Sequence, residues 1–396
     1  MLLITLLILA LVGWGIAEYH RHQTNINRIP VRIHINGSRG KSSVTRLVGG
    51  ALRESEKTVF TKTTGTSARM IYPDGEEHPV IRAGKPNIIE QLSIVRHALE
   101  FNPDIFVTEC MAVQPVLQKV VEDKMIRSTI GAVTNVRPDH LDEMGPAIED
   151  VELALAGTIP HHGVFFTAEQ KHYNQMEEIA VKRNTEFIKV SGDIISDEDM
   201  EGFGHIEHKD NVALALAIAE KLGVARDKAL AGMKKAKPDP GALRIYDLEF
   251  FGKSIKFVNA FAANDIESYR IIWRMLNIKR SENQRIIVLV NSRKDRIQRA
   301  EQLSDFIAGD VEADYFVIAG EYTRTLSQKA LNRGLDPGKL VEVGDIPVEN
   351  IFEKTISLIP EKGIVIGIGN IVGFGENIAM VFINRGKESV SRSVSN

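Results

Sequence analysis

The chain contains a single cysteine, Cys110, among its 396 residues. A framework of intrachain disulfides is therefore excluded, and the low cysteine content is typical of a reducing compartment. The sequence also lacks an excess of charge of either sign, because the formal net charge is only −3. Without a basic field, we do not expect nucleic acid as a partner. The sequence shows no internal repeat or low-complexity tract, and its length favours two globular domains.

The first 17 residues lack any charged side chain, and they also lack the basic n-region of a cleaved signal peptide. This run is long enough to predict one transmembrane helix, which we place over residues 1–19. An uncleaved signal-like segment or a buried core helix is the alternative. Arg21, Arg28 and Arg32 follow the apolar run, so the positive-inside rule places the rest of the chain on the cytoplasmic side.

Short apolar runs alternate with helical patterns along the rest of the chain, which predicts an α/β fold with mostly parallel sheets. The predicted strands cover residues 31–35, 104–110, 128–136 and 163–168, and then 254–261, 284–292, 313–320 and 363–370. Helical patterns cover residues 43–56, 87–101 and 209–223.

Proline and glycine interrupt the pattern at residues 234–244, "KKAKPDPGALR", which predicts a domain boundary. We therefore expect a larger α/β domain over residues 30–236 and a smaller one over residues 244–385. The polar residues 386–396 are expected to form a disordered tail.

A glycine-rich loop follows the first predicted strand, in the order expected for phosphate binding. Gly37 and Gly40 would let backbone N–H groups turn toward phosphate oxygens, Lys41 would reach the β- and γ-phosphates, and Ser42 would bind Mg²⁺. The usual first glycine of such a loop is missing, since position 35 is Ile. The alternative is an ordinary turn with a solvated lysine, but the position between a strand and a helix favours phosphate binding.

Acidic and imidazole side chains follow two further strands. Glu109 ends the strand in "VTECMA", where α/β sheets bind ligands, and it could hold Mg²⁺ or be an acid satisfied locally. The segment "NVRPDHLDEMG" brings together Asn135, Asp139, His140 and Asp142. His140 is a candidate metal ligand or general base, although a single loop histidine is more often a surface residue.

This ordered set of motifs resembles the Mur ligase superfamily of ATP-dependent ligases. The superfamily's short phosphate loop, G-T-x-G-K-[ST], is similar to residues 37–42 and accounts for the missing first glycine. Its strand-end glutamate resembles Glu109, and its N-x-x-x-D-H-L-D-x-x-G segment resembles residues 135–145. The resemblance implies a Mur-ligase-like P-loop ATPase domain followed by a smaller C-terminal α/β domain.

Within this superfamily, the chain resembles the ATP-dependent subunits of bacterial poly-γ-glutamate synthases, because an apolar span is fused directly to the P-loop domain. The segments "NGSRGKS", "KTTGT", "TECMAV", "PDPGALRI", "NAFAAND" and "GIGN" share this resemblance. It implies an enzyme of capsule synthesis that activates a terminal carboxylate of poly-γ-glutamate as an acyl phosphate. Glutamate would then be joined through an amide bond, with release of ADP and phosphate. The resemblance also implies ATP and Mg²⁺ as cofactors, small integral-membrane subunits as partners, and a single-pass location in the bacterial cell membrane.

The resemblance also implies roles for individual residues. Lys41, Glu109, His140 and Arg244 would take part in catalysis, and Ser42, Glu109 and His140 would hold metal ions. The nucleotide would be bound by Gly37, Ser38, Arg39, Gly40, Lys41, Ser42 and Ser43, together with Asn211, Asp295 and Arg299. Asn211 matches a helix asparagine near the adenine, although the residues alone favour a helix N-cap.

The second domain departs from the superfamily's pattern in several places. Arg244 lies three positions after Gly241 instead of directly after it, so a solvated linker arginine is the alternative. Asn259 stands where the superfamily has an acid, with Asn264 and Asp265 as possible substitutes. The lysine that many Mur ligases carbamylate has no counterpart in "ALAGTIPHHG", residues 154–163.

The segment "TKTTGTSARM", residues 61–70, carries Lys62, Thr64, Thr66 and Arg69, which suit contact with anionic groups. A flexible loop of solvated residues is the plain alternative.

Two functions of other classes remain as rivals to a ligase. A P-loop ATPase that only powers polymer export would not need glutamate for turnover. A non-catalytic membrane scaffold with a vestigial nucleotide site would tolerate Lys41→Ala.

Overall fold

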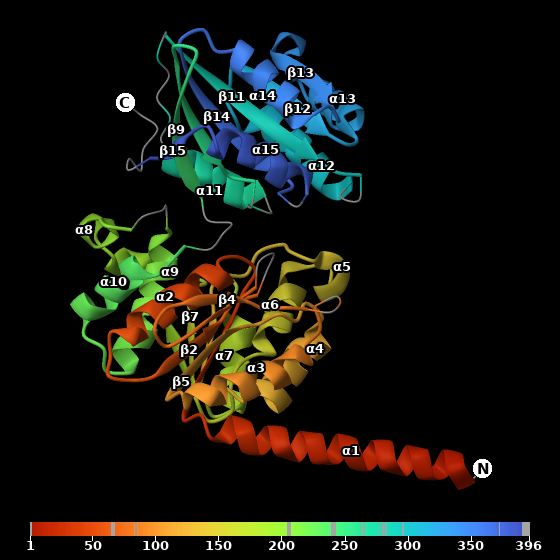
Figure 1. Ribbon diagram of the computed structural model, residues 1–396, viewed down its shortest axis with the longest axis vertical. Coiled ribbons are helices and arrows are strands. Elements are labelled where there is room, and N and C mark those ends of the chain that lie inside the picture. The colour runs from red at the N-terminus through yellow and green to blue at the C-terminus, as the bar shows by residue number, and fades with distance from the viewer. Residues whose placement is uncertain are drawn as a thin grey trace. The chain divides into compact units, whose positions relative to one another are not determined.

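The computed structural model describes residues 2–64, 68–82, 84, 86–203, 207–238, 243–261, 263, 266–276, 278, 281, 283–294, 297–371 and 373–389. The chain forms two compact units. The first contains residues 2–203 and 207–238, and the second contains the described residues from 243 onward. Figure 1 shows that each unit is built around a sheet of its own.

The first unit contains a sheet with the strand order β4-β3-β2-β5-β1-β6-β7-β8. Its strands are β1 Val31–Asn36, β2 Val59–Lys62, β3 Arg69–Ile71, β4 Glu77–Pro79, β5 Ile105–Glu109, β6 Ile130–Val133, β7 Val164–Thr167 and β8 Glu186–Lys189. Strands β2, β5, β1, β6, β7 and β8 pair in parallel, whereas β3 and β4 form an antiparallel extension at one edge.

The helices of the first unit begin with α1 Leu2–Asn27 and α2 Lys41–Arg53. They continue with α3 Glu90–Ala98, α4 Pro115–Val120, α5 Leu141–Met144, α6 Ile148–Ala156, α7 Asn174–Lys182, α8 Asp197–Met200, α9 Lys209–Lys221 and α10 Arg226–Lys235. Short 3₁₀ turns lie at Leu99–Phe101 and Gly192–Ile194, and a π-helix, η2, spans Val121–Ile126 directly after α4.

Helices cover both faces of this sheet, because its parallel strands are apolar on both sides. Ile33 and Ile35 pack on one face with α2, α9 and α10. Phe106 packs on the other face with α3 and the end of α1, while Val133 packs there with α6 and α7. Side chains alternate between the faces, so His34 and Asn36 lie on the second face.

The second unit has the strand order β13-β12-β11-β14-β10-β9-β15. Its strands are β9 Arg244–Phe250, β10 Lys253–Asn259, β11 Gln284–Ser292, β12 Tyr315–Gly320, β13 Leu340–Gly344, β14 Lys362–Gly369 and β15 Lys387–Glu388. Its helices are α11 Ile266–Leu276, α12 Ile297–Gly309, α13 Thr323–Asn332, α14 Val348–Ser357 and α15 Phe374–Ile383, with a 3₁₀ turn at Pro337–Lys339. The central strands pair in parallel, and β9 pairs antiparallel with β10 and β15.

The predicted mostly parallel α/β architecture is confirmed. Each predicted strand corresponds to an observed one, although the run at 128–136 yields a strand only over Ile130–Val133. Strands β2, β3, β4, β8, β9, β13 and β15 were not predicted, because they are short or interrupted by charged residues.

Both ends of the chain differ from the expectation. Helix α1 does not end near residue 19 but continues to Asn27, where Ile26 is fully buried against the first unit. Residues Lys387 and Glu388 form β15 instead of part of a disordered tail, because β9 offers them an open edge for backbone hydrogen bonds.

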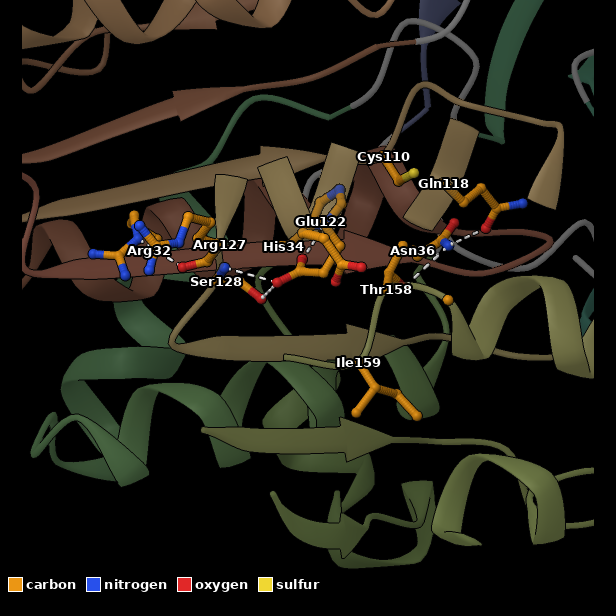
Figure 2. Close-up of polar contacts among 12 residues, drawn as sticks. Arg32, His34, Asn36, Cys110, Gln118, Glu122, Arg127, Ser128, Thr158 and Ile159 are labelled. Carbon is orange, nitrogen blue, oxygen red and sulfur yellow. Dashed lines mark hydrogen bonds and ion pairs between the residues drawn. The ribbon is translucent and has the colours of Figure 1, made fainter. Parts of the chain in front are cut away.

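A buried ion pair fills the second face of β1, where a histidine replaces an apolar side chain (Figure 2). His34 Nδ1 lies 2.8 Å from Glu122 Oε2, and both side chains are almost completely buried. Glu122 also accepts hydrogen bonds from the backbone N–H and the hydroxyl of Ser128, each at 2.8 Å. These contacts join β1 to η2.

A second buried polar group, Asn36, lies two residues further along the same strand (Figure 2). Its amide nitrogen donates to Gln118 Oε1 at 2.7 Å and to Thr158 Oγ1 at 3.2 Å. Gln118 in turn donates to the Val113 carbonyl at 2.7 Å. The last residue of β1 is thereby connected to α4 and to the chain that follows α6.

The His34–Glu122 pair predicts a loss of stability in alkaline solution. Burial alone would lower the pKa of His34, but its interactions with the neighbouring Cys110 and Glu122 outweigh it and raise the pKa to about 9. The pair therefore stabilises the fold fully below about pH 6.5, the pKa of an unfolded histidine, and this stabilisation disappears as the pH rises through 9. We expect the thermal midpoint of the first unit to fall between about pH 6.5 and 9.5.

The matched measurement compares the full-length chain with His34→Gln and with His78→Gln, which removes an exposed histidine. The alkaline loss should shrink in His34→Gln and persist in His78→Gln. Glu122→Gln should destabilise the unit by about 3 kcal/mol, because it leaves a buried cation unpaired. An identical pH profile in all the histidine variants would refute the assignment.

Candidate active site

The candidate site lies at the carboxyl end of β1, between β5 and β6. From β1 the chain proceeds to β2 on one side, and from β5 it crosses to β6 on the other side, so the strand order reverses here. Open α/β sheets bind ligands in the crevice at such a reversal. The elements that end here carry the glycine loop, Glu109 and the segment that contains His140.

The glycine loop has a backbone shape that other residues adopt poorly. Gly37 has φ +133° and Gly40 has φ +83°. A Cβ atom on Gly37 would lie 2.0 Å from Thr134 Oγ1, and one on Gly40 would lie 2.9 Å from Asn211 Oδ1. Both glycines are therefore needed for the close approach of the loop to β6 and α9.

The chain after β6 holds the loop in this shape. Asn135 accepts a hydrogen bond from the Arg39 N–H at 3.1 Å and donates one to the Arg39 carbonyl at 3.0 Å. The Ser38 N–H donates to the Asn135 carbonyl at 3.0 Å, and the Ser38 hydroxyl donates to the Arg137 carbonyl at 3.0 Å. The Thr134 hydroxyl donates to the Arg39 carbonyl at 2.5 Å. Asn135 therefore positions the loop.

Lys41 opens α2 and folds back over the loop. Its ammonium group donates to the Gly37 carbonyl at 2.6 Å and to the Ser38 carbonyl at 3.3 Å. Its charge is thus held above the loop at the N-terminus of a helix, where the backbone dipoles also favour an anion. Ser43 follows in the first turn of α2 and is half-buried.

Ser42 and Glu109 are brought into direct contact. The Ser42 hydroxyl donates to Glu109 Oε2 at 2.8 Å, and the backbone N–H of Thr64 donates to the same oxygen at 2.6 Å. Glu109 is only 2% exposed, and these donors are neutral. A buried carboxylate beside a serine hydroxyl offers the oxygen ligands that Mg²⁺ prefers, so this pair fits a divalent metal.

His140 lies at the same edge of the sheet but is more exposed and makes fewer contacts. It adopts a left-handed conformation with φ +46° directly before α5, and its side chain is 43% exposed. Its Nε2 lies 3.8 Å from Asp139 Oδ1, which also pairs with Arg39 at 2.9 Å. In the part of the chain that the structure describes, no three His, Cys, Asp or Glu side chains form a metal-binding group. Of the three expected metal ligands, Ser42 and Glu109 are therefore in direct contact, whereas His140 contacts neither of them.

Asn211 contacts the glycine loop from the first turn of α9. The N-cap of this helix is His208, so the N-cap interpretation of Asn211 was wrong. The side chain is 7% exposed, and its amide nitrogen donates to Glu207 Oε1 at 2.7 Å. Its oxygen lies next to Gly40, so Asn211 packs directly against the glycine loop.

Within the described part of the segment 61–70, residues 61–64 and 68–70, the alternative of a solvated loop is wrong. Lys62 ends β2 and is fully buried, with its ammonium group 2.9 Å from Glu90 Oε1. Burial lowers the pKa of Lys62, and Glu90 opposes that shift. Thr64 is buried next to Glu109, and Arg69 begins β3. Thr66 lies outside the described residues.

The expected residues of the second unit have contacts within that unit. Arg244 begins β9 and lies 3.6 Å from Glu388 of β15, so it is not a linker arginine. Arg299, on α12, donates to the Ala263 carbonyl at 2.5 Å and to the Tyr269 hydroxyl at 3.4 Å. Asn259 ends β10. Asp295, Asn264 and Asp265 lie outside the described residues.

The fold and the loop together define a Mur-ligase-like protein. The sequence profile of the Mur ligase middle domain matches residues 35–224. MurF from Acinetobacter baumannii superposes with a TM-score of 0.65 at 15% identity, covering 93% of this chain and 79% of that one. A bifunctional folylpolyglutamate synthase/dihydrofolate synthase from Yersinia pestis, complexed with AMPPNP and Mn ion, has a TM-score of 0.64 at 14% identity and 92% coverage of both chains. The predicted Mur-ligase-like fold is confirmed.

Relatives of higher sequence identity show which family within this class the chain belongs to. The profile of the poly-gamma-glutamate synthase CapB C-terminal domain matches residues 245–385. The capsule biosynthesis protein CapB of Bacillus anthracis is 38% identical over 378 residues, covering 92% of this chain and 79% of the relative. The PGA synthase CapB of Bacillus subtilis is 37% identical over 365 residues, covering 91% and 92%. The chain belongs to the CapB family, and it is an ATP-dependent ligase.

Sequence reasoning missed two residues that shape the site. Thr134 and Glu207 hold Arg39 and Asn211 respectively. Thr134 could have been noticed from its position at a strand end beside the recognised Asn135. Glu207 lies four residues before Asn211, a spacing that brings side chains together on adjacent helical turns and could have indicated this contact.

We predict that Gly37→Ala abolishes nucleotide binding, because its methyl group would collide with Thr134 and push the loop out of shape. Gly75→Ala is the matched control, since Gly75 has φ +87° but no heavy atom within 4 Å of the position that its methyl group would take. The control should lose only about 1–2 kcal/mol of stability from the left-handed backbone and should bind ATP normally. Equal ATP affinity of Gly37→Ala and Gly75→Ala, measured by equilibrium titration, would contradict this interpretation of the loop.

Proposed function

We propose that this protein is the ATP-dependent ligase of poly-γ-glutamate synthesis, a reaction that makes capsule material. It would bind ATP and Mg²⁺ and would join glutamate to the end of a poly-γ-glutamate chain. The relatives named as capsule biosynthesis protein and PGA synthase support this substrate. A folylpolyglutamate synthase/dihydrofolate synthase of the same fold, with Mn, AMPPNP and L-glutamate bound, supports the choice of ligands.

The contact between Ser42 and Glu109 is the observation that carries the proposal. It lies at the N-terminus of α2, one residue beyond Lys41, where an ATP phosphate chain on the glycine loop would meet a metal ion. Bound Mg²⁺ would neutralise charge that develops on the transferred phosphoryl group. Lys41 would bind the β- and γ-phosphates, and Asn211 would lie beside the nucleotide.

The reaction would take place in two balanced steps. A terminal carboxylate oxygen of the polymer would attack the γ-phosphorus of ATP, forming an O–P bond while the bond to the β-phosphate oxygen breaks and ADP leaves. The amine of glutamate would then attack the acyl carbon, forming the amide bond as phosphate leaves and the amine loses a proton. His140, partly exposed at the same edge, is the candidate to accept that proton or to assist in metal binding, and Arg244 and Arg299 are candidates for phosphate contact.

We also propose that α1 anchors the protein in the bacterial cell membrane as a single span, with both units in the cytoplasm. The helix is long and apolar enough to cross a membrane, and the apolar part is exposed in the structure. Arg21 and Arg28 follow the apolar part, which favours a cytoplasmic position for this end. A single span cannot form a conduit for an anionic polymer, so small integral-membrane subunits are the expected partners.

The decisive test measures ATP turnover by the detergent-solubilised full chain with Mg²⁺, alone and with partner subunits, with and without glutamate. We expect glutamate-dependent release of ADP and phosphate. Lys41→Ala should lower this turnover by roughly 100-fold or more, because it removes the ammonium group that would stabilise negative charge on the transferred phosphoryl group. Lys57→Ala, an exposed lysine away from the loop, is the matched control and should be fully active.

Other products would point to other functions. Release of AMP and pyrophosphate would mean that the carboxylate is adenylated, which contradicts the acyl phosphate. ADP release that ignores glutamate, even with partners present, would favour an ATPase that powers export. Polymer formation unaffected by Lys41→Ala would favour a scaffold.

The proposed metal site gives a separate prediction. Glu109→Gln keeps the shape and the acceptor oxygen for Ser42 and Thr64 but removes the charge, so it should raise the Mg²⁺ concentration needed for half-maximal ATP binding by roughly tenfold or more. Glu76→Gln, on an exposed turn, should not change it. An unchanged Mg²⁺ requirement in Glu109→Gln, measured by nucleotide titration at fixed ATP, would remove Glu109 from the metal site.

A further inference from the structure

The apolar helix α1 does not simply lead into the first unit but packs against it. The polar end of α1 lies beside α3 and η2, whereas the apolar part extends away from the unit (Figure 1). His22 bonds to the Met125 carbonyl at 2.7 Å, and Gln23 donates to the Lys124 carbonyl at 2.7 Å. The junction between the expected span and the globular unit is therefore a defined surface.

A cavity of about 250 Å³ lies at this junction, between α1 and α3. Its α1 wall includes Trp14, Glu18, Arg21 and Asn25, which are spaced by four, three and four residues and so share one helix face. Arg96 contributes a second guanidinium from α3. The cavity is thus lined by an indole ring at one end and by charged groups farther along the helix.

The two arginines of the cavity make no polar contact that stabilises the fold. Within the described part of the chain, neither Arg21 nor Arg96 has an ion-pair or hydrogen-bond partner. Both are exposed, as is Glu18, the acidic residue of the cavity. The guanidinium groups exceed the Glu18 carboxylate by one charge, which matches the single negative charge of a phosphodiester.

We propose that this cavity binds the phosphate-bearing headgroup of an anionic phospholipid. The inference rests on the proposed membrane span, because Trp14 would then lie near the end of the span, at the membrane interface, with the arginines just beyond it beside the headgroups. Tryptophan favours the membrane interface, and arginine binds phosphate oxygens through paired N–H donors. A basic site at the cytoplasmic end of a span also experiences the highest local concentration of anionic lipid. The bound headgroup would bridge α1 and α3 and so fix the catalytic unit against the membrane.

The test uses native mass spectrometry of the full chain in mixed micelles that contain equal amounts of phosphatidylglycerol and phosphatidylcholine. We expect wild type to retain phosphatidylglycerol preferentially. Arg21→Gln/Arg96→Gln should weaken this retention about tenfold, because each basic group near the headgroups contributes to binding an anionic lipid. The matched control, Arg28→Gln/Lys124→Gln, removes two exposed charges nearby but outside the cavity and should retain the lipid as wild type does.

The outcomes distinguish lipid binding in the cavity from membrane anchoring by α1. Equal retention by wild type and Arg21→Gln/Arg96→Gln, or equal loss in the control, would overturn the cavity as a specific site. Displacement of the lipid by millimolar inorganic phosphate would also overturn it, since the ligand would then be a soluble anion. Extraction of the wild-type chain from membranes by alkaline carbonate would overturn the span and this inference together. ATP turnover by both double variants at the wild-type rate would show that they are folded.

Discussion

The reciprocal hydrogen bonds between Asn135 and the backbone of Arg39 are the constraint on which the site depends. They lock the glycine loop to the chain after β6, and the pairing of β1 with β6 brings these two segments into register. Once the loop is fixed, α2 begins at Lys41, and Ser42 faces the end of β5, where Glu109 lies. Three strand ends and one helix start thus define the position of every phosphate- and metal-binding candidate in this unit.

The buried polar groups of β1 extend this constraint into the body of the first unit. If apolar side chains replaced His34 and Asn36, they would pack well enough to form the sheet, but they would not specify which helix covers it. Glu122 bonds to His34 Nδ1 and Gln118 bonds to Asn36, and these contacts join the strand before the glycine loop to η2 and α4. Because unpaired buried polar groups are costly, these pairs favour one arrangement of the helices over others.

The sequence was most informative where the physical signal is local. The parallel strands are buried on both faces, so β5 and β11 appear as continuous apolar runs, and the glycines next to Lys41 mark the phosphate loop without any tertiary knowledge. Strand β2 was missed because it has four residues and ends in Lys62, whose burial depends on Glu90 of a separate helix. The contact of Asn211 with Gly40 likewise joins distant segments, and only the resemblance to Mur ligases pointed to it.

The continuous helix from the apolar segment to Asn27 joins the first unit without a long linker. Only residues 28–30 separate α1 from β1, and Ile26 and Ile29 are both fully buried. With α1 in a bilayer, the first unit would not swing freely, as a domain on a long flexible linker does. The glycine loop, which follows the far end of β1, would therefore keep one orientation toward the lipid surface while its substrates arrive.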